Sequence, residues 1–105
     1  MNSDKQILGR IKKAVHEVEP TATIILYGSR ARGDNKPDSD WDLLILVNQR
    51  KISNQFEDSL LDPIYDIELD TDYIITPVIV EKELWETKHR FSPFYESVNK
   101  EGLLL

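Results

Sequence analysis

The chain has 105 residues, of which 40% are hydrophobic and 30% charged, and these proportions predict one soluble globular domain spanning residues 1–105. It contains no cysteine, which excludes disulfides, thiolate metal sites and cysteine nucleophiles. The formal net charge of −6 argues against nonspecific nucleic-acid binding, because that binding depends on lysines and arginines that neutralise phosphates. Since no apolar run is long enough to cross a membrane and the N-terminus lacks a signal-peptide pattern, we expect no membrane association and a cytoplasmic location.

The first predicted element is an amphipathic helix that ends before Pro20. Its apolar residues recur at helical spacing: Ile7, Ile11, Val15 and Val18. Ser3 and Gln6 have the spacing of a capping box at its start. His16 lies beside the apolar stripe, and with no second ligand nearby in sequence we interpret it as a surface or boundary histidine.

A strand is predicted at residues 23–27, followed by a short turn with features of a phosphate site. Gly28 removes a Cβ where a phosphate approaches the backbone. Ser29 is expected to cap a helical turn starting at Arg30, whose free amides favour an anion. Arg30 and Arg32 add positive charge, and Gly33 allows a sharp exit from the turn.

The next apolar run, residues 43–47, predicts a strand buried on both faces in the middle of a sheet. Because side chains alternate along a strand, Asp40 and Asp42 are expected on one face and Trp41 on the other. Two close carboxylates repel each other unless a cation lies between them. Their hard oxygen ligands suit Mg²⁺ or Mn²⁺, whose remaining positions are filled by water and substrate phosphate.

Two short motifs carry a resemblance to a known family. Residues 28–33 read Gly-Ser-Arg-Ala-Arg-Gly, and residues 39–43 read Ser-Asp-Trp-Asp-Leu. In this order they resemble the signature of the minimal nucleotidyltransferases, small members of the DNA polymerase β-like superfamily. The resemblance implies an α/β (α+β) nucleotidyltransferase fold, with a small mixed β-sheet of three or four strands flanked by helices.

The resemblance also implies a reaction and a set of site residues. Asp40 and Asp42 would be catalytic and would bind the metal, Mg²⁺ or Mn²⁺. The nucleotide-binding residues would be Gly28, Ser29, Arg30, Arg32 and Ser39. The substrate would be ATP or another nucleoside triphosphate, with AMP transferred to a hydroxyl of a protein or small molecule. Family members without a substrate domain often pair with a HEPN-type protein as toxin and antitoxin, so a HEPN-type partner is expected.

The second half of the chain is predicted to alternate helices with one further strand. A helix capped by Asn54 and Glu57 runs through residues 56–67, and Pro63 either kinks it or begins a second segment. A third strand covers residues 73–80, and Pro77 places it at an edge or at a bulge. Residues 81–86 begin a helix that packs Leu84 and Trp85.

The C-terminal part is predicted to contain one more helix and an apolar tail. Ser92 is the expected cap, Pro93 the first helical residue, and Gly102 the stop. The three leucines that follow either fold back onto this domain or contact another chain, which leaves an oligomer open.

The main departure from the family pattern is the third carboxylate, which should lie on the third strand. Counting along that strand places this position at or near Thr76, which cannot bind a metal as a carboxylate does. Asp70, Asp72 and Glu81 are the candidate replacements. Two hypotheses therefore stay open: a metal-dependent nucleotidyltransferase, or a catalytically impaired module that binds a nucleotide or a partner.

Overall fold

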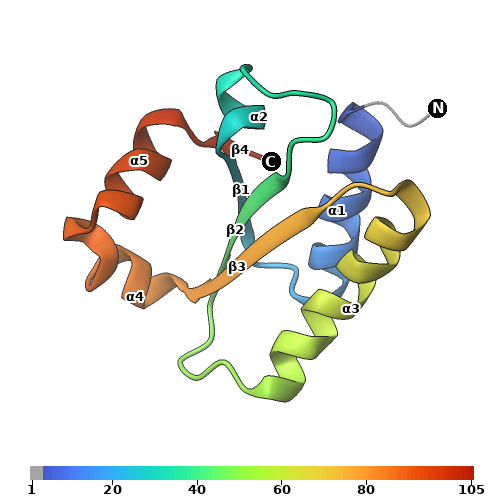
Figure 1. Ribbon diagram of the computed structural model, residues 1–105. Coiled ribbons are helices and arrows are strands. Elements are labelled where there is room, and N and C mark those ends of the chain that lie inside the picture. The colour runs from blue at the N-terminus through green and yellow to red at the C-terminus, as the bar shows by residue number, and fades with distance from the viewer. Residues whose placement is uncertain (1–3) are drawn as a thin grey trace.

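The computed structural model describes residues 4–105 and shows a central sheet with helices on both faces (Figure 1). In chain order the elements are α1 (Asp4–Val18), β1 (Thr23–Tyr27), α2 (Ser29–Arg32), β2 (Trp41–Val47), α3 (Asn54–Thr71), β3 (Ile75–Glu81), α4 (Lys82–Glu86), the 3-10 turn η1 (His89–Phe91), α5 (Pro93–Glu101) and β4 (Leu103–Leu104). The predicted α/β architecture is confirmed. The proposed capping box includes Ser3, which lies outside the described residues.

The sheet has the strand order β3-β2-β1-β4 and is mixed. Strand β2 runs antiparallel to β1 and parallel to β3, while β4 runs antiparallel to β1. Strand β2 therefore lies inside the sheet, as its unbroken apolar run predicts. Strand β3 is an edge strand, which accommodates Pro77 because one side of that strand needs no ladder donor.

Alternate residues of β2 contribute to two separate cores. Leu43, Ile45 and Val47 pack in the cluster formed with α1 and α3, which lie together on one face in Figure 1. Leu44 and Leu46 pack on the opposite face, with Trp85 of α4 and Val98 of α5. Because each face is covered, the strand is apolar at consecutive positions and not only at alternate ones.

The start of α5 follows the sequence signals, whereas the start of α3 requires a correction. Ser53, and not the predicted pair Asn54 and Glu57, is the N-cap of α3, and its hydroxyl accepts a hydrogen bond from the amide of Phe56 at 3.1 Å. Helix α3 continues through Pro63 without a break. Ser92 caps α5 as predicted, accepting from the amide of Tyr95 at 3.1 Å.

The leucine tail folds back onto its own domain, which is the first of the two alternatives. Leu103 and Leu104 form β4 against β1, and the amide of Leu105 donates to the carbonyl of Ile24 at 2.9 Å. Gly102 is required at the junction because a Cβ there would lie 2.5 Å from the carbonyl oxygen of Val98. The tail thus supplies the fourth strand of the sheet.

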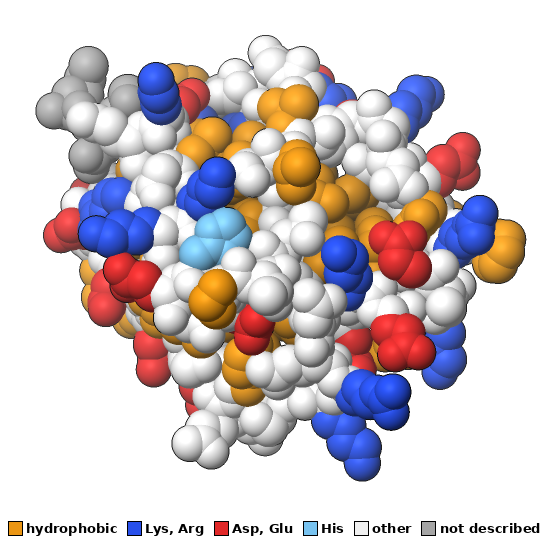
Figure 2. All heavy atoms as spheres, turned by 180° about the vertical axis from the view of Figure 1, so that it is seen from behind, with side chains coloured by type: hydrophobic (Ala, Val, Ile, Leu, Met, Phe, Trp, Pro, Cys, Tyr) orange, Lys and Arg blue, Asp and Glu red, His pale blue; other side chains and the backbone are white. Residues whose placement is uncertain are grey.

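The surface mixes charges of both signs. On the face shown in Figure 2, acidic and basic side chains are interspersed with small apolar patches. Among residues 4–105, no helix combines the length and apolar character that spanning a membrane requires.

Candidate active site

Helix α2 forms a tight turn at the end of β1. Gly28, with φ 78°, precedes the helix, and Gly33, with φ 85°, ends it in the left-handed conformation. The amide of Gly33 donates to the carbonyl of Ser29 at 2.9 Å, so the predicted sharp exit is confirmed. Ser29 does not cap the helix as expected, because it is the first helical residue and Gly28 occupies the N-cap position.

Gly28 lies directly against the acid pair. A Cβ at this position would collide with Oδ2 of Asp42, and it would lie 3.2 Å from the Cγ atom of that side chain. Only glycine leaves room for the carboxylate here. The Gly28-Ser29 turn and the Asp42 carboxylate therefore lie side by side in one continuous site.

The two aspartates meet at the end of β2. Asp42 is paired in the sheet with Tyr27 of β1 and Thr76 of β3. Asp40 immediately precedes the strand, and its Oδ2 accepts a hydrogen bond of 3.5 Å from the hydroxyl of Thr76. Because paired residues of neighbouring strands share a face, both carboxylates lie on the same face as Thr76. Trp41 packs on the other face, in the core with α1 and α3, as predicted.

The electrostatics of this pair favour a cation. Burial raises the pKa of Asp42 above its ordinary value, the charge of Asp40 raises it further, and the nearby Arg32 offsets part of this shift. The pKa of Tyr27 is also raised, first by burial and then by the charge of Asp42. Negative charge at this sheet end is thus incompletely compensated, and the carboxylate oxygens fit a hard divalent cation.

The two arginines of α2 point to different surroundings. Arg32 is 44% exposed and contacts Asp34 at 3.2 Å and Glu101 of α5 at 3.3 Å. The side chain of Arg30 is only 4% exposed. Its Nε atom donates to the carbonyl of Ser39 at 2.9 Å. Arg32 is therefore the arginine that lies open to a ligand near Asp42.

Comparison of the sequence with models of known protein families identifies the family of this chain. A family model described as nucleotidyltransferase domain matches residues 8–99. This chain belongs to the nucleotidyltransferase domain family. No curated protein matches the chain. Membership of this family supports nucleotidyl transfer as the general activity of the chain. Members of the family typically use a nucleoside triphosphate and a divalent metal.

The strand register of the nucleotidyltransferase domain places Thr76 where the third carboxylate was expected. Thr76 is the direct partner of Asp42. Glu81 pairs with Val47 at the far end of β3, five positions along the strand or about 16 Å away. Asp70 is bound to Arg10 at 3.0 Å, between α3 and α1.

The remaining candidate for a third acid is Asp72. Asp72 is the C-cap of α3 and lines a hollow with Pro37 and Asp38. Among residues 4–105 there is no cluster of three or more histidine, cysteine, aspartate or glutamate side chains suited to a metal ion. The acid pair is therefore supplemented by a hydroxyl and not by a third carboxylate.

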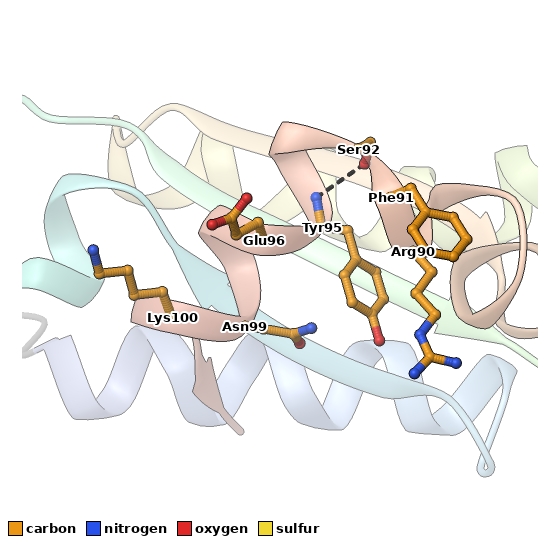
Figure 3. A pocket seen from close by; sticks show the side chains of 7 residues that line it. All are labelled: Arg90, Phe91, Ser92, Tyr95, Glu96, Asn99 and Lys100. Carbon is orange, nitrogen blue, oxygen red and sulfur yellow. Dashed lines mark hydrogen bonds between the residues drawn. The ribbon is translucent and has the colours of Figure 1, made fainter.

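One hollow of the nucleotidyltransferase domain lies on η1 and α5, away from the acid pair. It has a volume of about 600 Å³ and is lined by side chains of η1 and α5. Figure 3 shows that Tyr95 and Arg90 extend in the same direction along this hollow, while Glu96 and Lys100 lie toward its other end. None of its lining residues belongs to the turn at Gly28 or to β2, so the hollow is not part of the predicted site.

The surroundings of Ser39 and Arg30 were not predicted from the sequence. The hydroxyl of Ser39 accepts a hydrogen bond from the amide of Lys36 at 2.8 Å and so closes a turn in the loop before Asp40. The nucleotide-binding role of Ser39 stays a prediction, because the hydroxyl proton is still available for donation. Arg30 was expected to face phosphate, and it faces this loop. The cluster of Arg30 with Trp41 and Tyr73 could not be anticipated, because Tyr73 lies more than 30 residues further along the chain.

Proposed function

We propose that this domain transfers a nucleoside monophosphate, AMP from ATP, to a hydroxyl of a protein or small-molecule acceptor. The observation that carries the proposal is the contact between Gly28 and the Asp42 carboxylate. A turn suited to phosphate and a carboxylate suited to a divalent cation lie side by side, which is what a nucleotide–metal complex needs. Membership of the nucleotidyltransferase domain family supports the reaction class.

In this proposal each residue of the site has a separate role in binding the metal or the nucleotide. Asp40 and Asp42 would hold Mg²⁺ or Mn²⁺, which when bound neutralises phosphate charge and polarises the phosphoryl oxygens. Gly28 allows the terminal phosphates to approach the backbone, Ser29 offers a hydroxyl, and Arg32 offsets charge from the open side. Ser39 would donate its hydroxyl proton to a phosphate oxygen while its oxygen continues to accept from the amide of Lys36.

The transfer itself is a displacement at the α-phosphorus. The acceptor hydroxyl oxygen forms a bond to the α-phosphorus, and the bond from that phosphorus to the bridging oxygen breaks, so pyrophosphate leaves with the electron pair. The hydroxyl proton passes to water in this scheme, since Thr76 is not a base at neutral pH. We therefore expect slow turnover unless the acceptor supplies a base.

A second candidate function follows from Thr76. Its position opposite Asp42 leaves two carboxylates where the family pattern has three. A module with this site would bind nucleotide or a partner without efficient transfer. The two functions differ in whether a covalent product forms.

The acceptor proposed first is a HEPN-type protein. The motif at residues 28–43 resembles that of minimal nucleotidyltransferases, whose small members act as antitoxins by modifying a HEPN-type partner. In this proposal the domain silences its partner by adding AMP to one of its hydroxyls. A free small-molecule hydroxyl is the alternative acceptor.

The experiment uses ATP labelled at the α-phosphate, Mg²⁺, the full chain, and a purified HEPN-type protein as the acceptor. We expect the label to become covalently attached to the partner, whereas a γ-phosphate label is not transferred. Asp40→Asn and Asp42→Asn should abolish labelling, and Asp38→Asn, an exposed acid in the same loop, should not. Tight association without labelling, unaffected by the first two variants, would favour the binding module.

A further inference from the structure

Arg30 of α2 has a buried side chain that packs against the loop leading to the acid pair. Its guanidinium lies 4.1 Å from the ring centroid of Trp41 and 5.3 Å from that of Tyr73. Only 4% of its side chain is exposed. Because burying a charge is costly unless its donors are satisfied, a guanidinium is stable here only if its surroundings are specific.

The hydrogen bonds of Arg30 tie α2 to this loop. Its Nε donates to the carbonyl of Ser39 at 2.9 Å, and its Nη2 donates to the carbonyl of Pro37 at 3.1 Å. Its Nη1 lies 3.9 Å from a carboxylate oxygen of Asp4 at the start of α1. One side chain thus joins the turn after β1, the loop before β2 and the first helix.

These contacts bracket Asp40 on both sides. Arg30 holds the carbonyl of the residue before it, Ser39, and stacks on the ring of the residue after it, Trp41. Asp40 itself lies outside β2, so the regular strand ladder does not include it. The position of its carboxylate therefore depends on how its two neighbours are held.

We propose that Arg30 is the positioning residue of the acid pair: its guanidinium clamps the backbone and ring on either side of Asp40, and so holds that carboxylate beside Asp42. The proposal rests on the metal-binding role proposed above for the two aspartates. It gives Arg30 a role in placing a metal ligand without contact to the nucleotide.

Arginine is required for this clamp because of its shape. The planar guanidinium can stack on an indole ring and donate from two nitrogens to two carbonyls at once. A lysine of similar length keeps the charge, but it has a single nitrogen and no flat surface to stack. Arg30→Lys therefore tests the geometry of the clamp separately from its charge.

The test compares wild type, Arg30→Lys and Arg10→Lys. Arg10 lies on α1, where it pairs with Asp70, and serves as a matched control. Hydrogen exchange in the absence of metal follows the amides of Ser39 and Trp41, which bond to the carbonyls of Lys36 and Ile74. Titration with Mn²⁺ alone, followed by the loss of the free-ion paramagnetic resonance signal, measures the affinity of the acid pair.

We expect both amides to exchange faster in Arg30→Lys, and Mn²⁺ affinity to fall roughly 10- to 100-fold, as when groups that orient metal ligands are removed. The β1 amides should exchange as in wild type, and Arg10→Lys should match wild type in both measurements. Unchanged exchange and unchanged affinity in Arg30→Lys would overturn the proposal.

Two further measurements separate failure of the Arg30 proposal from misfolding of the variant and from failure of the metal-binding function. If Arg30→Lys does not fold, Tyr73→Leu replaces it: this change opens one side of the guanidinium, and faster exchange at Ser39 would support the clamp while wild-type exchange would overturn it. If wild type binds no Mn²⁺, the metal-binding function fails. The exchange data then still decide whether Arg30 holds the loop.

Discussion

The contact between Gly28 and Asp42 gives the sharpest prediction, through the substitution Gly28→Ala. Gly28 has φ 78° and ψ −160°, a region that is almost exclusive to glycine. The new methyl group would also meet Oδ2 of Asp42. Gly33 provides a matched control, since it too has a positive φ, of 85°, but a Cβ there would meet no atom within 4 Å.

The backbone conformation and the space around each glycine determine how much the alanine substitution lowers the free energy of unfolding. Backbone strain at Gly28 should cost about 1–3 kcal/mol, and forcing the carboxylate aside should add about 1–3 kcal/mol. At Gly33 only the left-handed backbone is penalised, at about 1–2 kcal/mol. Gly28→Ala should therefore lower the free energy of unfolding by about 2–6 kcal/mol, more than Gly33→Ala does.

Urea denaturation of both variants, alone and combined with Asp42→Ala, measures this difference. Removing the Asp42 carboxylate removes the collision, so the cost of Gly28→Ala should shrink by about 1 kcal/mol or more in that background. The cost of Gly33→Ala should not change. Equal costs at the two glycines, or no coupling between Gly28 and Asp42, would refute the reasoning.

Three further predictions concern the acid pair and a helix cap. Because the folded-state pKa of Asp42 is raised above its ordinary value of 3.8, its ionised form destabilises the fold. Asp42→Asn should therefore raise the melting temperature of the metal-free domain at pH 7. This gain in stability should shrink as the pH is lowered and be absent well below 3.8, where Asp42 is protonated in both the folded and the unfolded chain. A lower melting temperature of the variant at pH 7 would contradict the prediction. Thr76→Asp adds a third carboxylate opposite Asp42, so it should lower metal-free stability by about 1 kcal/mol and tighten Mn²⁺ binding in the same resonance titration. Weaker Mn²⁺ binding would show that the added carboxylate does not reach the site. Ser53→Ala should cost about 1 kcal/mol in urea denaturation through loss of the α3 cap, whereas Ser59→Ala, which removes a hydroxyl from the exposed side of the same helix, should cost less than half as much.

In the proposed transfer reaction, Thr76 in the place of an acid would limit catalysis by the isolated domain. Its hydroxyl reaches Asp40 but cannot accept a proton from the acceptor at neutral pH. An acceptor that brings its own base would overcome this limit. Measuring transfer to different acceptors with wild type and Thr76→Asp would separate the contribution of the acceptor from that of the domain.

Local patterns in the sequence predicted much of the fold. The apolar run of β2 indicated a strand covered on both faces, because only such a strand is apolar at consecutive positions. Pro77 indicated an edge strand, and Ser92 with Pro93 marked the start of α5. The spacing of Asp40 and Asp42 predicted one shared face. Each of these signals acts within a few residues, through backbone geometry or side-chain alternation.

The sequence by itself thus determined most of the elements and predicted the chemical type of the site, while only the tertiary structure decided how distant residues meet there. The parallel register of β2 with β3 placed Thr76 opposite Asp42 and left Glu81 at the far end. Packing turned Arg30 inward, onto Trp41 and Tyr73, and left Arg32 exposed. Register and packing depend on contacts between segments far apart in the chain, and local sequence patterns limit which face each side chain takes without fixing which distant residue it meets.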